Sequence, residues 1–339
     1  MEGIDTIKQA LKAFSLPPAR VEPVAGGLIH RSYLIILGPP ERERRYVLQG
    51  LHEALSNVSV LADHASVSHH LQSAGRLAPT PIRTSAGQLS VMIDGIRWRL
   101  LNFVPGETII GRSATVEEAV LAGRELAQFH NVMASFQGRF SSTHPGHNTE
   151  YHLNGLRESF ESAPEGLRAE LERSCTELLD RLPRFIMPET LPRFVVHGDP
   201  KLTNFRFQEK RAVLIDLDTC TRHTRLVDLG DALRSWCHEP EVALGHISWT
   251  RGEAFLEAYL SHATPLSEEE RLWLPRCAVT ISLELAARFA RDFFEDSYFA
   301  YDETRYESRR AHNQVRTKGM LYLAENFEQS AERISAVIA

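Results

Sequence analysis

The apolar pattern of this chain changes at the stretch NFVPGET, where Pro105 and Gly106 end an extended segment. Before that point, apolar residues alternate or form short runs that are typical of strands. These segments are residues 21–25, 31–37, 45–49, 88–94 and 96–104. The pair Asp94-Gly95 is a strong hairpin signal, and helical spacing appears at residues 57–75. The first hundred residues therefore predict a small antiparallel sheet that carries a helix.

Helical spacing dominates the remainder of the chain. Thr115 and Glu118 form a capping box ahead of a helical pattern at residues 119–136. Further helical patterns occupy residues 151–182, 226–237, 248–262 and 267 to the end, and short strands are expected at 193–197, 204–208 and 211–218. The whole pattern predicts an α+β fold with a small sheet lobe followed by a larger, mainly helical lobe.

The length of 339 residues exceeds what one hydrophobic core usually supports. We therefore expect two lobes, residues 1–104 and 105–339, divided where the pattern changes.

Composition excludes several classes of protein. The formal charge of -6 and the pI near 6.2 argue against nucleic acid as a partner. The four cysteines form no C-x-x-C pair, and a reducing compartment fits them. The N-terminus lacks the features of a signal peptide, and no run approaches the ~20 apolar residues of a membrane span. We expect a cytoplasmic protein whose partner is a small molecule, and its oligomeric state is left open.

The stretch FVVHGDPKLTNFRF places polar side chains where a strand ends, and VLIDLD follows shortly after. Asp199 has the position of a base that receives or orients a hydroxyl proton. Lys201 could neutralise a moving phosphoryl group, and Asn204 offers a hard oxygen to Mg²⁺. Asp216 and Asp218 share one face if the strand continues that far, and Mg²⁺ held by Asp216 and Asn204 would relieve their repulsion.

An isolated His-Gly-Asp triplet is weak evidence, because it often forms a tight turn whose aspartate bonds its own backbone. The full spacing H-G-D-x-K-x-x-N, followed by I-D-x-D, is much more specific. We expect His197 to hold the loop rather than to act as a base.

These motifs resemble the aminoglycoside phosphotransferase and choline kinase superfamily, which has the protein-kinase-like fold. The resemblance implies ATP and Mg²⁺ as cofactors, Asp199 as catalytic base, and Asn204 and Asp216 as metal ligands. Lys201 matches the lysine that protein kinases keep two positions after their base. The stretches RYVLQGLH, IDLDT, DLGDALRSW and ELAARFARDFFEDSYF are most similar to the N-acetylhexosamine 1-kinase branch. That branch implies transfer of phosphate from ATP to the anomeric hydroxyl of an N-acetylated sugar.

One position departs from the general kinase pattern. Kinases of this fold usually have a lysine on the third strand, and this chain has Gln49, which carries no charge. Asp63 and His64 occupy the helix where the partner glutamate is expected, so the usual ion pair is absent. The complete catalytic loop favours an active enzyme, and a nucleotide-binding pseudokinase is the alternative.

Other candidates for nucleotide binding occupy the positions where kinases of this fold have their phosphate-covering loop and their hinge. A glycine pair between the first two strands could let the backbone approach phosphate closely. The adenine is expected against the backbone of the hinge. These residues are Gly26 and Gly27 in the loop, and Leu101, Asn102, Phe103 and Val104 in the hinge.

Candidate acceptor residues lie around the base and near the C-terminus. They are Asp218, Asp228, Asp231, Arg234, Arg288, Asp292 and Tyr298. Simple ion pairs, Arg234 with Asp231 and Arg288 with Asp292, are equally consistent with their spacing. Choline, homoserine, hydroxylysine and aminoglycosides are rival acceptors, and a Mg²⁺-dependent hydrolase that uses Asp199, Asp216 and Asp218 is a further alternative. The sequence does not decide between ATP and GTP.

Overall fold

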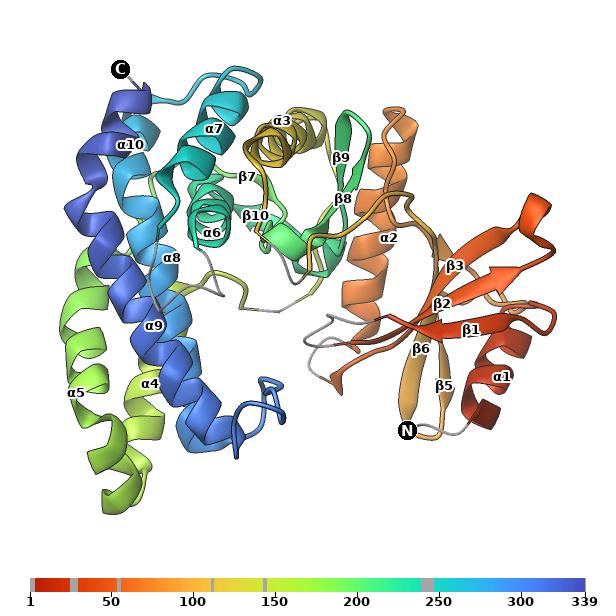
Figure 1. Ribbon diagram of the computed structural model, residues 1–339, viewed down its shortest axis with the longest axis horizontal. Helices are drawn as coiled ribbons and strands as arrows, with labels where there is room; N and C mark the ends of the chain where they lie inside the picture. The colour runs from red at the N-terminus through yellow and green to blue at the C-terminus, as the bar shows by residue number, and fades with distance from the viewer. Residues whose placement is uncertain are drawn as a thin grey trace.

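The computed structural model describes residues 4–24, 30–53, 56–110, 113–142, 145–238 and 247–338. It has a small lobe built on an antiparallel sheet and a larger helical lobe, which lie on opposite sides of α2 in Figure 1. The predicted two-lobed α+β fold is confirmed. The boundary at residue 104 stays a prediction.

The small lobe is one antiparallel sheet with a helix against it. The strand order is β1-β2-β3-β6-β4, and β5 also pairs with β6. The elements are α1 (Ile4–Ala13), β1 (Arg20–Pro23), β2 (Arg31–Leu37), β3 (Arg44–Gly50), β4 (Pro81–Ile82), β5 (Val91–Ile93) and β6 (Ile96–Asn102). The β5–β6 hairpin turns at Asp94 and Gly95, which both have positive φ as a tight hairpin of this kind requires.

The small lobe has its own hydrophobic core. Ile7 and Leu11 on one face of α1, with Phe14 directly after the helix, pack with Leu48 and Trp98 of the sheet. The apolar face of this amphipathic helix is therefore what holds it to the strands.

The large lobe is a set of helices around two short hairpin-like pairs, β7 with β10 and β8 with β9. Capping boxes at Thr115 and Ser267 fix the starts of α3 and α8. The helices are α3 (Val116–Met133), α4 (Thr149–Ser162), α5 (Glu165–Arg181), α6 (Leu226–Cys237), α7 (Trp249–Leu260), α8 (Glu268–Glu295), α9 (Arg309–Gln329) and α10 (Ala331–Ile338). The strands are β7 (Phe194–Val196), β8 (Phe205–Gln208), β9 (Arg211–Leu214) and β10 (Thr221–His223).

Helix α2 (Val58–Ser73) is part of the first hundred residues but packs with the large lobe. Its N-cap is Asn57. Val67 and Leu71 belong to the same hydrophobic cluster as the large-lobe helices, not to the cluster of the sheet. Figure 1 shows α2 standing between the sheet and the β8–β9 pair. Helix α2 therefore belongs to the hydrophobic core of the large lobe.

Within the part of the chain that the structure describes, no helix has the length and apolar character needed to cross a membrane.

Candidate active site

The loop after β7 brings Asp199, Lys201 and Asn204 together. Lys201 Nζ donates to Asp199 Oδ2 at 2.5 Å, and Asn204 Nδ2 donates to the same oxygen at 3.0 Å and to the Asp199 carbonyl at 2.8 Å. Because the amide nitrogen of Asn204 is used in this way, its oxygen is left for a cation. About a quarter of each side chain of the Asp199–Lys201 pair remains exposed, so both reach solvent.

The charges in this loop determine each other's protonation. Burial raises the pKa of Asp199, but the charge and hydrogen bond of Lys201 outweigh it, and the pKa is lowered. Burial lowers the pKa of Lys201, but the charges of Asp199 and Asp216 outweigh it, and the pKa is raised. Asp199 is therefore an anion and Lys201 a cation near neutral pH.

Hydrogen bonds from His197 and Gly198 hold the loop to the lobe behind it. His197 Nε2 donates to the Ile215 carbonyl at 2.9 Å, and its Nδ1 accepts the Asp199 amide at 3.2 Å. Gly198 has φ +81°, and a Cβ there would lie 2.5 Å from the Thr219 carbonyl oxygen. A side chain at this position would therefore push apart two segments that carry candidate site residues.

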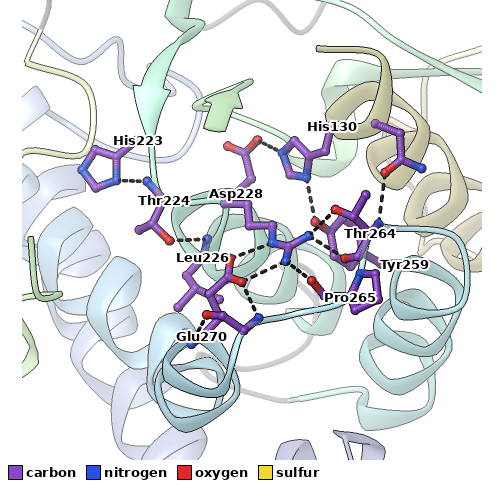
Figure 2. A network of polar contacts seen from close by, with 12 residues as sticks. His130, His223, Thr224, Leu226, Asp228, Tyr259, Thr264, Pro265 and Glu270 are labelled. Atoms are coloured by element: carbon purple, nitrogen blue, oxygen red, sulfur yellow. Dashed lines mark hydrogen bonds and ion pairs between the residues drawn. The ribbon is translucent and has the colours of Figure 1, made fainter. Parts of the chain in front are cut away.

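Asp228 at the start of α6 anchors the same loop from within the lobe. Its oxygens accept the amides of His197 at 2.7 Å and Gly198 at 2.8 Å, and His130 Nε2 donates to it at 2.9 Å. Figure 2 shows this contact extending through His130 to Tyr259. Arg225, three residues before Asp228, forms a buried ion pair with Glu270. Asp228 thus serves the scaffold, and its oxygens are not directed to an acceptor.

Asp216 follows β9 and has a left-handed backbone, φ 66° and ψ 65°. The strand β9 ends at Leu214, and after Asp216 the chain enters the 3-10 turn Leu217–Thr219. The expectation that Asp216 and Asp218 share a strand face is therefore wrong, because the strand ends before either residue. The Ile215 amide donates to the Asn204 carbonyl at 2.8 Å, which brings Asp216 beside the loop of Asp199.

The donor set around Asp216 fits Mg²⁺. No group of three or more His, Cys, Asp or Glu side chains that could hold a metal is found among the described residues. One carboxylate and one amide oxygen match the way Mg²⁺ is held in phosphoryl-transfer sites, with water and substrate phosphates as its other ligands.

Asp218 is 4% exposed and points toward the small lobe. Arg99 Nη1 and Nη2 donate to its two oxygens at 2.6 and 2.7 Å, and His64 and His30 contact them at 2.8 and 3.1 Å. Burial raises the pKa of Asp218, but Arg99 and the two histidines lower it well below its usual value. These contacts occupy both oxygens of Asp218. The structure therefore does not support Asp218 as a residue that binds the acceptor molecule.

The remaining acceptor candidates divide into two groups. Asp292 is buried and accepts the amides of Ser297, Tyr298 and Phe299, so it closes the end of α8 and forms no pair with Arg288. Asp231 accepts two bonds from Arg234 through Oδ1, which is the ion pair considered from sequence.

Asp231 and Arg288 keep unused polar atoms. Oδ2 of Asp231 is buried and has no hydrogen-bond partner among the described residues. Arg288 lies over the Phe299 ring, 5.8 Å from its centroid, and forms no hydrogen bond or ion pair with the residues that the structure describes. The charge of Asp231 raises the pKa of Lys201, so this carboxylate lies near the loop that carries Asp199 and Lys201.

Tyr298 extends from the loop after α8 toward the small lobe. Its ring contacts His52, with centroids 6.0 Å apart in an edge-on arrangement. This contact joins the two lobes.

Sequence reasoning missed the pair His147 and Glu284. His147 Nδ1 donates to Glu284 Oε1 at 2.8 Å, and its Nε2 donates to the Gly198 carbonyl at 3.0 Å. Burial lowers the pKa of His147, but the charge and hydrogen bond of Glu284 raise it to about 9. A charged His147 therefore supports the loop beside Asp199. No local pattern indicates this, because the two residues are 137 positions apart.

On the nucleotide side, Gly26 and Gly27 lie outside the described residues. Gln49 accepts a hydrogen bond from Arg99 Nε at 2.9 Å and donates to Ser32 Oγ at 3.1 Å.

In the hinge, Leu101 and Val104 are buried, and the amides of Asn102 and Phe103 donate to carbonyls of the chain. The guanidinium groups of Arg45 and Arg206 both contact the Phe103 ring, 5.9 and 5.0 Å from its centroid.

Comparison with known proteins identifies the family. The model of the phosphotransferase enzyme family matches residues 20–273 of this chain. The chain belongs to this phosphotransferase family. The match confirms the aminoglycoside phosphotransferase and choline kinase superfamily predicted from the catalytic motifs, and the protein is a small-molecule kinase.

Curated relatives of this phosphotransferase include homoserine kinases. The one from Xanthobacter autotrophicus is 26% identical over 262 residues, which is 75% of each chain. The one from Rhodopseudomonas palustris is 23% identical over 296 residues, 86% of this chain and 85% of the relative.

Solved structures share its fold. An amicoumacin kinase in complex with AMP-PNP and Ca²⁺ has a TM-score of 0.67 and 14% identity over 97% of each chain. A microcompartment-associated aminopropanol kinase has a TM-score of 0.66 and 18% identity, covering 97% of this chain and 98% of that one.

Proposed function

We propose that this phosphotransferase transfers the γ-phosphoryl group of ATP to a hydroxyl of a small polar acceptor, with Mg²⁺ as the metal. The observation that carries the proposal is the convergence of Asp199, Lys201, Asn204 and Asp216 at one edge of the large lobe. Kinases of this kind work mainly by positioning and electrostatic stabilisation, and this set provides both.

Each residue of the set has a separate task in this proposal. Asp199, an anion with a lowered pKa, accepts the hydrogen bond of the acceptor hydroxyl and orients it. Lys201 offers its ammonium to the charge on the phosphoryl group. The Asn204 amide oxygen and the Asp216 carboxylate hold Mg²⁺, which neutralises nucleotide phosphate charge when bound.

The nucleotide would lie between the sheet and the large lobe. The amides of Asn102 and Phe103 already donate to the carbonyls of Thr80 and Arg45. We therefore assign the amide of Val104 as the hinge donor to the adenine. Gly26 and Gly27 remain candidates for covering the phosphates, and the choice of ATP over GTP rests on the family. A cytoplasmic location also remains a prediction, which four reduced and buried cysteines support.

For the acceptor, we place an amino alcohol with a carboxylate, such as homoserine, first. Its ammonium would bind the unpaired Oδ2 of Asp231, and its carboxylate would bind the guanidinium of Arg288. The relatives named homoserine kinase support this order, as does the neighbour named aminopropanol kinase.

An N-acetylhexosamine is the second candidate. The stretch DLGDALRSW and the late helical motifs favour it, and Asp231 Oδ2 would then accept a sugar hydroxyl or the amide N–H.

An acceptor panel tests the proposal. Initial rates would be measured with Mg²⁺-ATP and matched concentrations of L-homoserine, 1-amino-2-propanol, choline and N-acetylglucosamine, with detection of the phosphorylated product. We expect homoserine to give the highest kcat/KM. Highest activity on N-acetylglucosamine would reverse the order of the two acceptors.

The same assay separates the rival functions. Tight ATP binding without any phosphorylated acceptor would establish a pseudokinase and overturn the proposal. Release of phosphate from a simple ester in the absence of ATP would point to the hydrolase.

A further inference from the structure

Arg99 and Asp218 form a buried ion pair that joins the two lobes. Arg99 lies on β6 of the small lobe, and Asp218 lies in the turn that follows Asp216 in the large lobe. Both guanidinium NH₂ groups donate to the carboxylate, at 2.6 and 2.7 Å, and each side chain is only 1% exposed. A bidentate pair of this kind fixes both distance and orientation.

Gln49 orients the guanidinium. Gln49 and Arg99 are direct partners in the β3–β6 register. The Gln49 amide oxygen accepts from Arg99 Nε at 2.9 Å while its amide nitrogen donates to Ser32 Oγ at 3.1 Å. With Nε held by Gln49, the two terminal nitrogens face Asp218. A lysine at position 49 would instead place a second cation beside Arg99, which accounts for the neutral residue there.

Two histidines complete the contacts of Asp218. His64 of α2 donates from Nδ1 to Oδ1 at 2.8 Å, and its Nε2 donates to the Pro79 carbonyl at 2.9 Å. His30 contacts Oδ2 through Nε2 at 3.1 Å, while its Nδ1 accepts the His52 amide. Each oxygen of Asp218 therefore has a donor from Arg99 and one from a histidine.

The turn that carries Asp218 also carries Asp216. Asp216 immediately precedes the 3-10 turn Leu217–Thr219, so the two carboxylates are two residues apart. At the other end of the turn, Thr219 Oγ1 donates to the His197 carbonyl at 2.8 Å. Asp216 is thus followed by two anchored residues: Asp218 is bound to Arg99 of the small lobe, and Thr219 is bound to His197 in the loop before Asp199.

We propose that Arg99, oriented by Gln49, is a positioning residue that holds the lobes together through Asp218 and thereby places Asp216 for the metal. The cation that kinases of this fold usually have on the third strand is here on the neighbouring strand, and a protein carboxylate is its partner. The role of Asp216 in this inference rests on the proposed function, whereas the tie between the lobes does not.

The test compares Arg99→Met, Arg99→Lys and the double variant Arg99→Met/Asp218→Asn with the wild type. Arg97→Met is the matched control, because Arg97 lies on the same strand and its guanidinium donates to Ser90 within the small lobe. Thermal unfolding first establishes that each variant is folded. Arg99→Lys keeps the positive charge but cannot form the bidentate pair. It replaces Arg99→Met in the comparison if Arg99→Met does not fold.

The first readout is the Mg²⁺ concentration that gives half the maximal rate. We expect it to rise about tenfold or more in the Arg99 variants, as for other residues that orient metal ligands, and to stay within about twofold in Arg97→Met. The double variant removes the orphaned carboxylate, so we expect it to regain thermal stability but not the wild-type Mg²⁺ requirement. Recovery of both would show a merely structural role and overturn the inference.

The second readout is independent of activity. Amide hydrogen exchange in β6 and in residues 216–220 should become faster in Arg99→Met than in Arg97→Met. Equal exchange in the two folded variants, with an equal Mg²⁺ requirement, would overturn the inference while leaving the kinase function intact. A wild type that phosphorylates no acceptor would instead overturn the proposed function, and the exchange experiment would still test the tie between the lobes.

Discussion

Asp199 and Lys201 lie two positions apart and share one short hydrogen bond, and each stabilises the charged form of the other. A carboxylate beside an ammonium is a weak base, so in the proposed reaction Asp199 would mainly orient the acceptor hydroxyl rather than remove its proton in advance. Gly198 and His197 keep the pair in place, and the charged His147 contacts the same loop.

Replacing Asp199 with Asn keeps the shape of the side chain and removes its charge. We expect kcat to fall by about 10²–10⁴-fold, the range for loss of a positioned base. The dissociation constant for Mg²⁺-ATP should change little, since Asn204 and Asp216 remain. Calorimetric titration with a nonhydrolysable ATP analogue measures the binding, and equal loss of binding and rate would contradict the assigned role.

The pair of His147 and Glu284 makes stability depend on pH. The pKa of His147 is raised to about 9, so its contribution is complete below the unfolded-state value near 6.5 and is lost as the pH rises through about 9. The pKa of Glu284 is lowered to about 2, because His147 outweighs the effect of burial, and its contribution is lost as the pH falls from about 4.5 toward 2.

Glu284→Gln should therefore lower the free energy of unfolding most between about pH 5 and 6.5, by on the order of 3 kcal/mol at most. The difference from the wild type should shrink as the pH approaches 9. Urea unfolding at several pH values measures it. A difference that is constant from pH 5 to 9 would show that the pair does not titrate in this way.

Among the elements, α2 has a position that its place in the chain does not reveal. Its Asp63 accepts the amides of Ser141 and Ser142 in the large lobe, at 3.0 and 2.8 Å, and His64 meets Asp218. In the usual kinase arrangement this helix would present a glutamate to the sheet. Here its polar side chains are directed to the large lobe, and its apolar residues pack there as well.

Asp63→Ala should detach this part of α2 from residues 141–142. Because it leaves two backbone donors without their partner, we expect a loss of about 2–4 kcal/mol in the free energy of unfolding. Hydrogen exchange of the 141–142 amides should become faster. Asp63→Asn retains one acceptor oxygen and should lose less, and an equal loss in the two variants would show that the hydrogen bonds are not the cause.

At the scale of the whole molecule, two hydrophobic cores are joined by polar contacts. The sheet and α1 form one core, and α2 with the large-lobe helices forms the other. Arg99 with Asp218, and His52 with Tyr298, connect the two sides. A ligand that contacts both lobes should therefore stabilise the whole chain against unfolding.

Mg²⁺-ATP at one hundred times its dissociation constant should raise the free energy of unfolding by about 2.7 kcal/mol. Removal of the metal with EDTA should cancel most of this gain, because Asn204 and Asp216 are proposed to contact the nucleotide only through Mg²⁺. Thermal unfolding with ATP, with Mg²⁺ and with both measures the effect. Equal stabilisation by ATP with and without Mg²⁺ would contradict the assigned metal site.

Local patterns were enough to predict the two-lobed α+β fold and the family, because strand alternation, capping boxes and the spacing around Asp199 are all short-range signals. The same spacing predicted that Asp199, Lys201, Asn204 and Asp216 converge, since a strand end and the following hairpin return the chain to one edge. The roles of these residues stay predictions.

Only the tertiary structure decided which charges face one another. Asp216 and Asp218 were expected to share one face of a strand, but the strand ends at Leu214 and the backbone at Asp216 is left-handed. Asp218 instead meets Arg99, 119 positions away. The sequence showed that Gln49 replaces the lysine usual on the third strand of such kinases. The structure shows that Arg99 on the adjacent strand β6 provides a positive charge beside it. A local pattern contains no information on pairs so far apart in the chain, because their contact depends on how the lobes pack.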